Sequence, residues 1–152
     1  MPQCTILVGI PGSGKTTWLQ ENTKASECII SPDRFLEENY DYQWTPARAS
    51  EAWAVSYQRF AGFLQNKQDV IWDATFLQPI DRSAILHIAN GFDYKTVAVV
   101  LLTPLELCLE RNRKRPRQPV PDDKIIAMQS RMIVPTREEG FDEIRIVQTN
   151  NG

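Results

Sequence analysis

The sequence predicts an α/β fold in which about five parallel strands are flanked by helices. Three observations lead to this class. Short apolar runs alternate with longer helical patterns, a glycine-rich turn joins the first run to the first helical pattern, and Val97–Leu102 is apolar at every position. A strand without polar residues suits a sheet that is covered on both faces. Because ligands of such sheets bind at the carboxyl ends of the strands, residues that directly follow the runs are expected to meet.

Five apolar runs are expected to form the strands. Each is short and bounded by polar or turn-forming residues, as buried strands are. The first helix is expected to begin in the glycine-rich turn and to reach about Lys24. The runs lie, in chain order, at Cys4–Val8, Glu27–Ser31, Asp69–Asp73, Lys95–Leu102 and Glu143–Val147.

The longest helix is expected from Thr45 to about Asn66. Thr45 has the hydroxyl of a good N-cap, and Pro46 suits the first helical turn because its missing amide needs no partner there. The helical period brings four apolar residues onto one broad face. These residues are Ala52, Val55, Phe60 and Phe63.

Three later helices are expected. The first spans Pro79–Asn90 and ends at Gly91, since glycine is a common helix stop. The second opens at Thr103–Glu106, where the threonine oxygen and the glutamate carboxylate would form a capping box. The third runs from Asp122 to about Val134.

Length and composition limit the function classes. The chain has 152 residues, 42% hydrophobic and 24% charged, which is ordinary for one folded domain over residues 1–152. Disorder, collagen and coiled coil are excluded as descriptions of the whole chain. The formal net charge of -2 argues against a generally basic nucleic-acid binder.

Cysteine usage and hydropathy favour a cytoplasmic protein. Cys4, Cys28 and Cys108 have neither zinc spacing nor the even count of a disulfide framework, so we expect reduced thiols. The first residues lack the basic start of a signal peptide. No stretch approaches the roughly 18 apolar residues of a membrane span, and no membrane partner is expected.

A phosphate-binding loop is the sharpest motif. Residues Gly9–Thr16 read GIPGSGKT and fit the pattern G-x-x-x-x-G-K-[ST] between an apolar run and a helical pattern. Glycines let backbone amides turn toward phosphate oxygens, and the amino end of the new helix faces the same oxygens. Lys15 adds a positive charge at the β and γ phosphates, and Thr16 offers a hydroxyl to Mg²⁺. The sequence therefore predicts a P-loop NTPase site for ATP and Mg²⁺, with nucleotide contacts from Gly9, Gly12, Ser13, Gly14, Lys15, Thr16 and Thr17.

Two carboxylates follow the strands expected beside this loop. Asp33 lies just past the second run, and Asp73 ends the third. Phosphoryl transfer to an alcohol needs a carboxylate that orients the acceptor hydroxyl and takes its proton, and we expect Asp33 in this role. A second carboxylate can hold the hydration shell of Mg²⁺, and we expect Asp73 there as a catalytic and metal residue. The alternatives are a helix N-cap at Asp33 and a turn residue at Asp73.

A basic segment lies near the end of the expected fourth helix. Arg111–Arg117 holds five cations in seven residues, and two prolines follow it. Arginine forks match phosphate oxygens and stabilise charge on a transferring group, and they also bind nucleic-acid backbones. Arg111 and Arg115 are four residues apart, so one helical face can present both. We expect an Arg-rich lid segment over about residues 111–121; the alternative is a solvated face that complements the helix dipole.

Together these motifs resemble the polynucleotide 5′-kinase family, meaning the bacteriophage enzyme and the kinase domains of bacterial RNA-repair proteins. The resemblance covers most of the chain and implies an adenylate-kinase-like fold, with transfer of the γ-phosphate of ATP to a hydroxyl in the presence of Mg²⁺. The segments that carry it are Gly9–Trp18, Ser31–Asp33, Trp72–Thr75, Glu110–Arg115 and Arg137–Phe141.

The resemblance also implies roles for single residues. Lys15 and Thr16 would bind the triphosphate and the metal, and Asp33 would be the general base. Arg115 would be the lid arginine, with Arg111 beside it as a nucleotide contact.

Two positions on the acceptor side depart from the usual pattern of the family. Leu36 stands where the motif Asp-x-x-Arg has its arginine, and Phe76 stands where the family often has asparagine. The preferred expectation is an ATP-dependent kinase for a hydroxyl on a nucleic acid, most of all a 5′-OH polynucleotide end. Other acceptors stay open: a hydroxymethylated base within DNA, which would have to be flipped out, a nucleotide or a small metabolite. A P-loop ATPase or nucleotide-binding switch is the alternative of another class.

Aromatic residues follow Asp33 in the chain. Their rings suit either base stacking with a single strand or ordinary packing. His87, the only histidine, is expected at the surface or the edge of the core, so we expect no histidine-based mechanism. The aromatic residues are Tyr40, Tyr42, Trp44 and Trp53.

Overall fold

The structure is a computed structural model and describes residues 1–23, 28–116 and 119–148. Within these residues, five strands form one parallel sheet in the order β2-β3-β1-β4-β5. This confirms the expected α/β class and its parallel sheet. The strands are β1 (Gln3–Val8), β2 (Cys28–Ile30), β3 (Val70–Trp72), β4 (Lys95–Leu102) and β5 (Glu143–Gln148).

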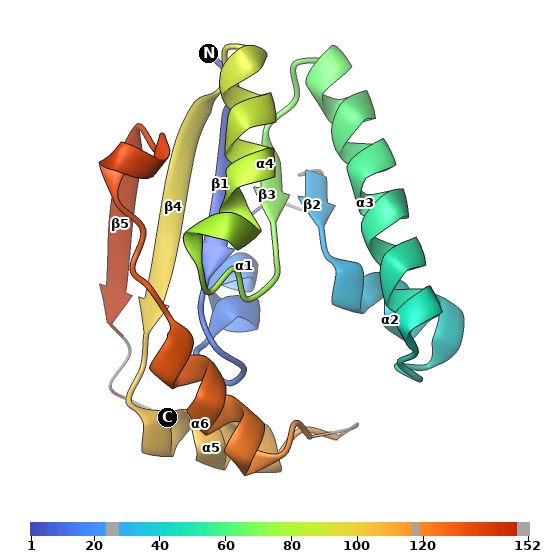
Figure 1. Ribbon diagram of the computed structural model, residues 1–152, viewed down its shortest axis with the longest axis vertical. Helices are drawn as coiled ribbons and strands as arrows, with labels where there is room; N and C mark the ends of the chain where they lie inside the picture. The colour runs from blue at the N-terminus through green and yellow to red at the C-terminus, as the bar shows by residue number, and fades with distance from the viewer. Residues whose placement is uncertain (24–27, 117–118, 149–152) are drawn as a thin grey trace.

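Helices lie on both faces of the sheet. Helices α3 and α4 cover the face turned toward the viewer in Figure 1, and α1 lies behind the sheet. Helices α2, α5 and α6 gather near the end toward which the strand arrows point. The bounds are α1 (Lys15–Asn22), α2 (Pro32–Tyr40), α3 (Pro46–Gln65), α4 (Pro79–Gly91), α5 (Leu105–Arg113) and α6 (Asp122–Arg131), with a short 3-10 helix at Arg137–Glu139.

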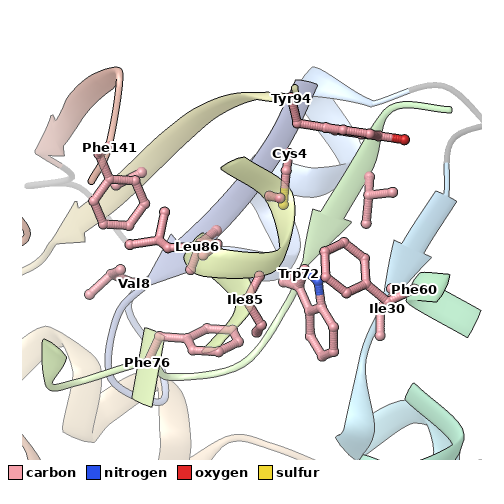
Figure 2. Close-up of a cluster of buried hydrophobic side chains, with 14 of the residues drawn as sticks. Cys4, Val8, Ile30, Phe60, Trp72, Phe76, Ile85, Leu86, Tyr94 and Phe141 are labelled. Atoms are coloured by element: carbon pink, nitrogen blue, oxygen red, sulfur yellow. The ribbon is translucent and has the colours of Figure 1, made fainter. Parts of the chain in front are cut away.

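The core follows from the alternation of side chains along the strands. In β1, Ile6 belongs to the larger apolar cluster, which includes Phe60 of α3 and Ile85 of α4. Figure 2 shows this cluster around the fully buried Trp72. Leu7, the next residue of β1, points to the opposite face and joins a second cluster with Leu19 of α1. The sheet is therefore apolar on both sides, as the run Val97–Leu102 indicates.

A third apolar cluster positions the functional end of the molecule. It joins Ile10 of the glycine-rich turn to Cys108 of α5 and Ile125 of α6, with Leu77 from the segment after β3. All four side chains are buried. The phosphate loop and the two helices at the ends of the basic segment are thus packed against one another.

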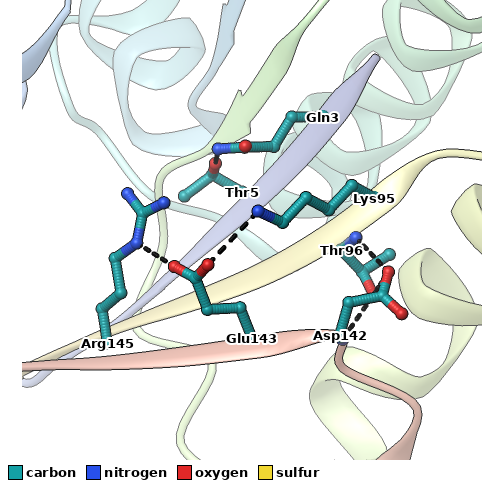
Figure 3. A network of polar contacts seen from close by, with 7 residues as sticks. All are labelled: Gln3, Thr5, Lys95, Thr96, Asp142, Glu143 and Arg145. Atoms are coloured by element: carbon teal, nitrogen blue, oxygen red, sulfur yellow. Dashed lines mark hydrogen bonds and ion pairs between the residues drawn. The ribbon is translucent and has the colours of Figure 1, made fainter. Parts of the chain in front are cut away.

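A polar network fixes the start of β5 against β4 (Figure 3). The carboxylate of Asp142 accepts from the Thr96 amide at 2.8 Å, and the Asp142 amide donates to the Thr96 carbonyl at 2.9 Å. Glu143 pairs with Lys95 at 3.2 Å and with Arg145. These contacts lie at the amino end of the strands, away from the residues expected to bind phosphate.

The expected strands and the longest helix are confirmed to within a few residues. Thr45 caps α3, since its side-chain oxygen accepts from the Arg48 amide at 3.1 Å. The buried stripe of α3 differs in part from the expected one, because the residues facing the sheet recur at four-residue intervals. It consists of Ala52, Ser56, Phe60 and Leu64, while Val55 and Phe63 are half-buried.

Two expected helix boundaries differ from the structure by about one residue. Pro104, rather than Thr103, occupies the N-cap of α5, and the Thr103 hydroxyl donates to the Ser13 carbonyl at 2.7 Å. Gly91 does not end α4 but is its last residue; Phe92 caps the helix, and the left-handed residue is Asp93, with φ of 63°.

The third later helix is also shorter than expected. Helix α6 ends at Arg131 rather than near Val134. The Ile133 amide donates to the Leu77 carbonyl at 2.8 Å, so the chain there is held extended against the segment after β3. Of the residues named in the sequence expectations, Lys24, Glu27 and Arg117 lie outside the described residues.

Helix α2 is an element that the sequence expectations lacked. Ser31 is its N-cap and accepts from the Arg34 amide at 3.2 Å, with Pro32 in the first turn. Asp33 therefore lies inside the first turn, which excludes the alternative that Asp33 is the cap. Across the described ranges, none of the helices combines the length and the apolar character that crossing a membrane requires.

Candidate active site

The phosphate loop is shaped by two glycines with positive φ. Gly14 has φ of 102° and caps α1, so the first amides of that helix open toward the loop. Gly12 has φ of 82°, and a Cβ there would lie 2.4 Å from the Cys108 carbonyl oxygen. A side chain at Gly12 would therefore displace the loop from α5.

The loop is also tied to the two neighbouring strand ends. The Gly9 amide donates to the Thr75 carbonyl at 3.1 Å, just past β3. Thr103, just past β4, donates to the Ser13 carbonyl at 2.7 Å. Lys15 crosses the loop, with its ammonium group 2.7 Å from the Gly9 carbonyl. Contacts with the segments after β3 and β4 and with the Lys15 side chain thus fix the backbone of the phosphate loop.

The loop borders a cleft of about 640 Å³ at the carboxyl ends of the strands. We call it the first cleft. It collects nearly all residues that the sequence places in the site, although they come from four separate segments. The expected site residues that line it are Gly12, Gly14, Lys15, Thr16, Thr17, Asp33, Asp73, Arg111 and Arg115.

Two expected nucleotide contacts do not line the first cleft. Ser13 is buried beneath the loop, with 1% of its surface exposed, and Gly9 is buried where β1 ends. A Cβ at Gly9 would lie 2.5 Å from the Ser13 side-chain oxygen, so the two residues pack against each other. Gly9 and Ser13 therefore help to fix the shape of the phosphate loop from its buried side.

The two acids enter the first cleft from neighbouring strands. Asp73 directly follows β3, and its amide donates to the Ile30 carbonyl of β2 at 2.8 Å. Asp33 is exposed in the first turn of α2. Because β2 and β3 pair in parallel, both carboxylates arrive at the same edge of the sheet.

The electrostatics of the cleft couple Lys15 to both acids. Burial lowers the pKa of the Lys15 ammonium group, and the charges of Asp73 and Asp33 oppose this shift. Burial raises the pKa of the Asp73 carboxyl, the charge of Lys15 lowers it, and the charge of Asp33 raises it further. A desolvated ammonium group gains from an anionic partner, so a phosphate bound at the loop would favour the charged form of Lys15.

Arg111 and Arg115 face the loop from the end of α5 and beyond. The Arg111 guanidinium donates to the Gly12 carbonyl at 3.2 Å. Arg115 is exposed and lines the first cleft together with Lys15 and Tyr42. The two arginines thus line the same cleft as the phosphate loop and the start of α2.

The donor set suits Mg²⁺ bound together with a triphosphate. Thr16 and Asp73 both line the first cleft and supply hard oxygen atoms, which Mg²⁺ prefers. In the described part of the chain, no group of three or more histidine, cysteine or carboxylate residues forms an independent metal centre. A metal ion held mainly by phosphate oxygens and water needs no such centre.

Arg34, Glu37 and Tyr42, on and just after α2, line the first cleft beside Asp33. Tyr42 is one of the aromatic residues considered for base stacking, whereas Arg34 and Glu37 were not expected in the site. Tyr42 has φ of 62°, and a hydrogen bond with Glu37 contributes to the rise of its pKa, after burial. The four-residue spacing of Asp33 and Glu37 would have indicated a shared helical face, had α2 been recognised.

The other aromatic residues after Asp33 divide between packing and exposure. Trp53 stacks on Trp72 with ring centroids 5.8 Å apart, and Tyr40 donates to the Glu51 carboxylate at 2.8 Å. Trp44 is 63% exposed. His87 is exposed on α4, as expected.

Comparison with protein families and curated proteins gives two matches. The model of a family described as AAA domain matches residues 5–135. An L-seryl-tRNA(Sec) kinase from Methanococcus maripaludis is 27% identical over 151 residues. The match covers 90% of this chain and 55% of that protein, so the chain spans about half the length of this relative.

Solved structures share the fold at low identity. A candidate kinase from Chloroflexus aurantiacus superposes with a TM-score of 0.74 at 20% identity, covering 98% of this chain and 89% of that one. The Pnkp1/Rnl/Hen1 RNA repair complex contains a chain with a TM-score of 0.75 at 24% identity, covering 86% and 43%. A sugar kinase from a Janibacter species has a TM-score of 0.67 at 15% identity, covering 97% and 86%. The fold is thus common to proteins named for different acceptors and does not single out the polynucleotide 5′-kinases.

Proposed function

The chain belongs to the AAA domain family, and we propose that it is an ATP-dependent kinase that phosphorylates a hydroxyl on a nucleic acid, with a 5′-OH end as the preferred acceptor. One observation carries this proposal: Asp33 and Asp73 line the same cleft as Lys15 and Thr16, and Arg111 and Arg115 line it as well. A phosphate loop alone would serve any nucleotide-binding protein. A loop faced by an exposed carboxylate and by arginines is equipped for transfer to a second substrate.

The proposed reaction needs little covalent chemistry from the protein. The acceptor oxygen forms a bond to the γ-phosphorus while the bond from that phosphorus to the bridging oxygen of ADP breaks. The hydroxyl proton passes to the carboxylate of Asp33, which is exposed at the acceptor side of the first cleft. Lys15 and the two arginines stabilise the charge on the transferring group.

Mg²⁺ would bridge phosphate oxygens and reduce their charge when the nucleotide is bound. Thr16 is the hydroxyl donor nearest the start of α1, and Asp73 is the acid next to β3; we assign them to the metal and its water shell. Both are residues of the first cleft.

The nucleic-acid acceptor is supported by the sequence motifs and by the names of similar proteins. The motifs resemble those of the polynucleotide 5′-kinases, and two of the similar proteins are named for RNA: the L-seryl-tRNA(Sec) kinase and the RNA repair complex. The placement of the cations agrees with this acceptor. Lys15, Arg34, Arg111 and Arg115 line the first cleft and supply cations for phosphate oxygens, although four carboxylates (Glu21, Asp33, Glu37 and Asp73) line it as well and the whole chain has a formal charge of -2.

A second candidate acceptor is a hydroxyl on a small molecule or on a modified base. Leu36, at the position where the resembling family has an arginine, is buried with 7% of its surface exposed. It therefore offers no cation to a phosphate next to the acceptor hydroxyl. The similar sugar kinase structure favours keeping this candidate.

The decisive experiment is a transfer assay with γ-labelled ATP and a panel of acceptors. The panel contains 5′-OH DNA, 5′-OH RNA, DNA with hydroxymethylated bases, nucleosides and simple sugars. We expect label on the 5′-OH polynucleotides. Label found only on a small molecule would support the second candidate, and steady ATP hydrolysis with no labelled acceptor would instead indicate an ATPase or a switch.

A further inference from the structure

A second cleft of about 410 Å³ adjoins the first cleft. The two share Ala74 and Thr75, the residues that directly follow Asp73. The second cleft continues from there between α3, the start of α4 and the end of α6. Its other lining residues are Trp53, Phe76, Leu77, Gln78, Asp81, Met128 and Arg131. A molecule whose hydroxyl lies near Asp33 and Asp73 therefore has a continuous space in which to extend.

On the α3 side, the second cleft is lined by the indole ring of Trp53, which packs against Trp72. Trp53 is half-buried and lies nearly parallel to Trp72, with 16° between the ring planes and 5.8 Å between the centroids. Phe76 meets Trp53 edge-on at 6.1 Å. Figure 2 shows Trp72 and Phe76 in the core, where their rings meet edge-on at 6.2 Å. The indole ring of Trp53 is thus held in place from the core side while it borders the cleft, as a stacking platform for a planar group requires.

On the α6 side, the second cleft is lined by one cationic side chain, that of Arg131. Arg131, the last residue of α6, is exposed and lines the second cleft. Its backbone carbonyl accepts from the Gln78 side chain at 3.4 Å, which fixes the end of α6 beside the start of α4. The acid of this cleft, Asp81, is already engaged, because its carboxylate accepts from the Gln78 amide at 3.1 Å in the cap of α4. In the described residues no carboxylate forms an ion pair with Arg131, so its guanidinium can serve a ligand anion.

We propose that the second cleft binds the first nucleotide of a single-stranded nucleic-acid end, with its base stacked on Trp53 and a backbone phosphate beside Arg131. An aromatic platform and a cation on facing walls match the two recognisable parts of a nucleotide, the base and the phosphate. The volume exceeds what a single hydroxyl or a small alcohol needs. This inference rests on the proposed function, since it places the acceptor hydroxyl in the first cleft.

The test measures binding separately from transfer. A fluorescently labelled 5′-OH tetranucleotide is titrated with the full chain, without ATP, and its anisotropy is followed. Trp53→Ala should weaken binding at least about fivefold, because stacking of one base on an aromatic ring contributes about 1–3 kcal/mol. Trp53→Phe should retain most of the affinity. Trp44→Ala, which removes an exposed tryptophan that does not line the second cleft, should bind like the wild type.

Arg131 gives a second, independent readout. Arg131→Gln should weaken binding and reduce the dependence of affinity on salt concentration, as expected when one phosphate contact is lost. Lys124→Gln is the matched control, because Lys124 is exposed on the same helix but does not line the cleft. Arg131 is exposed, so its replacement leaves the fold intact even if Trp53→Ala lowers the stability.

The outcomes separate the two proposals. If no nucleic acid accepts label in the transfer assay, the proposed function fails, while the anisotropy titrations still decide the second cleft. If the acceptor KM and the binding affinity of Trp53→Ala and Arg131→Gln equal those of the wild type, the second cleft is not the acceptor site. A wild-type chain that does not bind the tetranucleotide also overturns this inference.

Discussion

The side chain of Asn112, near the end of α5, is joined by hydrogen bonds to both backbone groups of Val120, which precedes α6. Its amide nitrogen donates to the Val120 carbonyl, and its oxygen accepts from the Val120 amide at 3.1 Å. Asn112 is 1% exposed, so these bonds are shielded from water. A salt bridge of 2.6 Å joins Arg113, the last residue of α5, to Asp122, the first residue of α6. These contacts therefore hold the end of α5, with Arg113, against the start of α6.

Replacing Asn112 should weaken the connection between the end of α5 and the segment before α6. Asn112→Ala leaves the amide and the carbonyl of Val120 without their partner, and an unmade buried hydrogen bond costs about 1–3 kcal/mol. We expect the free energy of unfolding in urea to fall by about that amount and the KM for ATP to rise. Asn90→Ala, which removes an exposed amide bonded to the Gly140 carbonyl, is the control and should change stability by less than about 1 kcal/mol. An unchanged KM together with an unchanged stability would contradict the role of Asn112.

Gly12 should not tolerate even a methyl group. Its φ of 82° disfavours other residues, and a Cβ would lie 2.4 Å from the Cys108 carbonyl oxygen. We expect Gly12→Ala to lower the free energy of unfolding by about 1–3 kcal/mol and to weaken ATP binding, because the loop must move away from α5. The matched substitution is Gly62→Ala in α3, where a Cβ meets nothing within 4 Å. It should stabilise the protein by about 0.5–1 kcal/mol; equal effects of the two substitutions would show that the clash is relieved without moving the loop.

Lys15 and Asp33 should separate binding from transfer. Lys15→Ala removes the cation of the phosphate loop, so both ATP affinity and transfer should be lost. Asp33→Ala removes the proposed base and should lower kcat about 10²–10⁴-fold while ATP affinity stays near that of the wild type. Calorimetry of ATP binding and the transfer assay measure the two effects. Glu38→Ala changes an exposed acid of α2 that does not line the first cleft, and it should leave both unchanged; an equal loss of ATP binding in Asp33→Ala would exclude the role of base.

The parts of the fold that could be predicted from the sequence are those with a local signal. The run Val97–Leu102 and the motif Gly9–Thr16 each contain their own evidence, and both lie where expected. The parts that were missed depend on partners far away in the chain. The pattern at Thr103 indicated the start of a helix, but it gave no sign of the hydrogen bond that the Thr103 hydroxyl donates to the Ser13 carbonyl, ninety residues away in the chain. Local propensity could not reveal that contact.

The candidate site shows the same division. Asp33 and Asp73 could be grouped because parallel strands end at one edge. Tyr42 could not, since its position depends on a left-handed turn after a helix that was not expected. Asn112 lies within a run of cations, and only the structure shows that it is buried.

Arg82 is a second buried polar residue that the sequence did not reveal. It is fully buried in α4, forms a bidentate salt bridge with Glu139 at 2.9 Å, and donates to the Phe76 carbonyl at 2.7 Å. Arg82→Met should lower the free energy of unfolding by about 3–5 kcal/mol, because Glu139 then loses its partner in a largely buried position. Lys95→Gln, in the half-buried pair with Glu143 of Figure 3, should cost at most about 1 kcal/mol. Urea denaturation compares them, and equal losses would show that the pair of Arg82 gains nothing from its burial.

Asp73 should destabilise the nucleotide-free protein at neutral pH. Burial raises the pKa of its carboxyl above the ordinary value of 3.8, against the opposing charge of Lys15. The native state therefore binds this proton more tightly than the unfolded state does. Stability from this group is complete below the ordinary aspartate pKa and is lost as the pH rises through the raised pKa. At pH 7 the ionised, desolvated carboxylate opposes folding.

Asp73→Asn should consequently raise the free energy of unfolding at pH 7 while it abolishes or strongly reduces phosphoryl transfer. The gain should shrink as the pH falls toward the ordinary aspartate pKa, because the wild-type carboxyl is then neutral in both states. Urea denaturation of both proteins without nucleotide, from pH 7 down to the acid limit of folding, measures the difference. Glu38→Gln, an exposed carboxylate on α2, should change stability by less than about 0.5 kcal/mol at pH 7. A gain for Asp73→Asn that does not vary with pH would come from packing rather than from charge, and a loss at pH 7 would mean that the attraction to Lys15 outweighs desolvation.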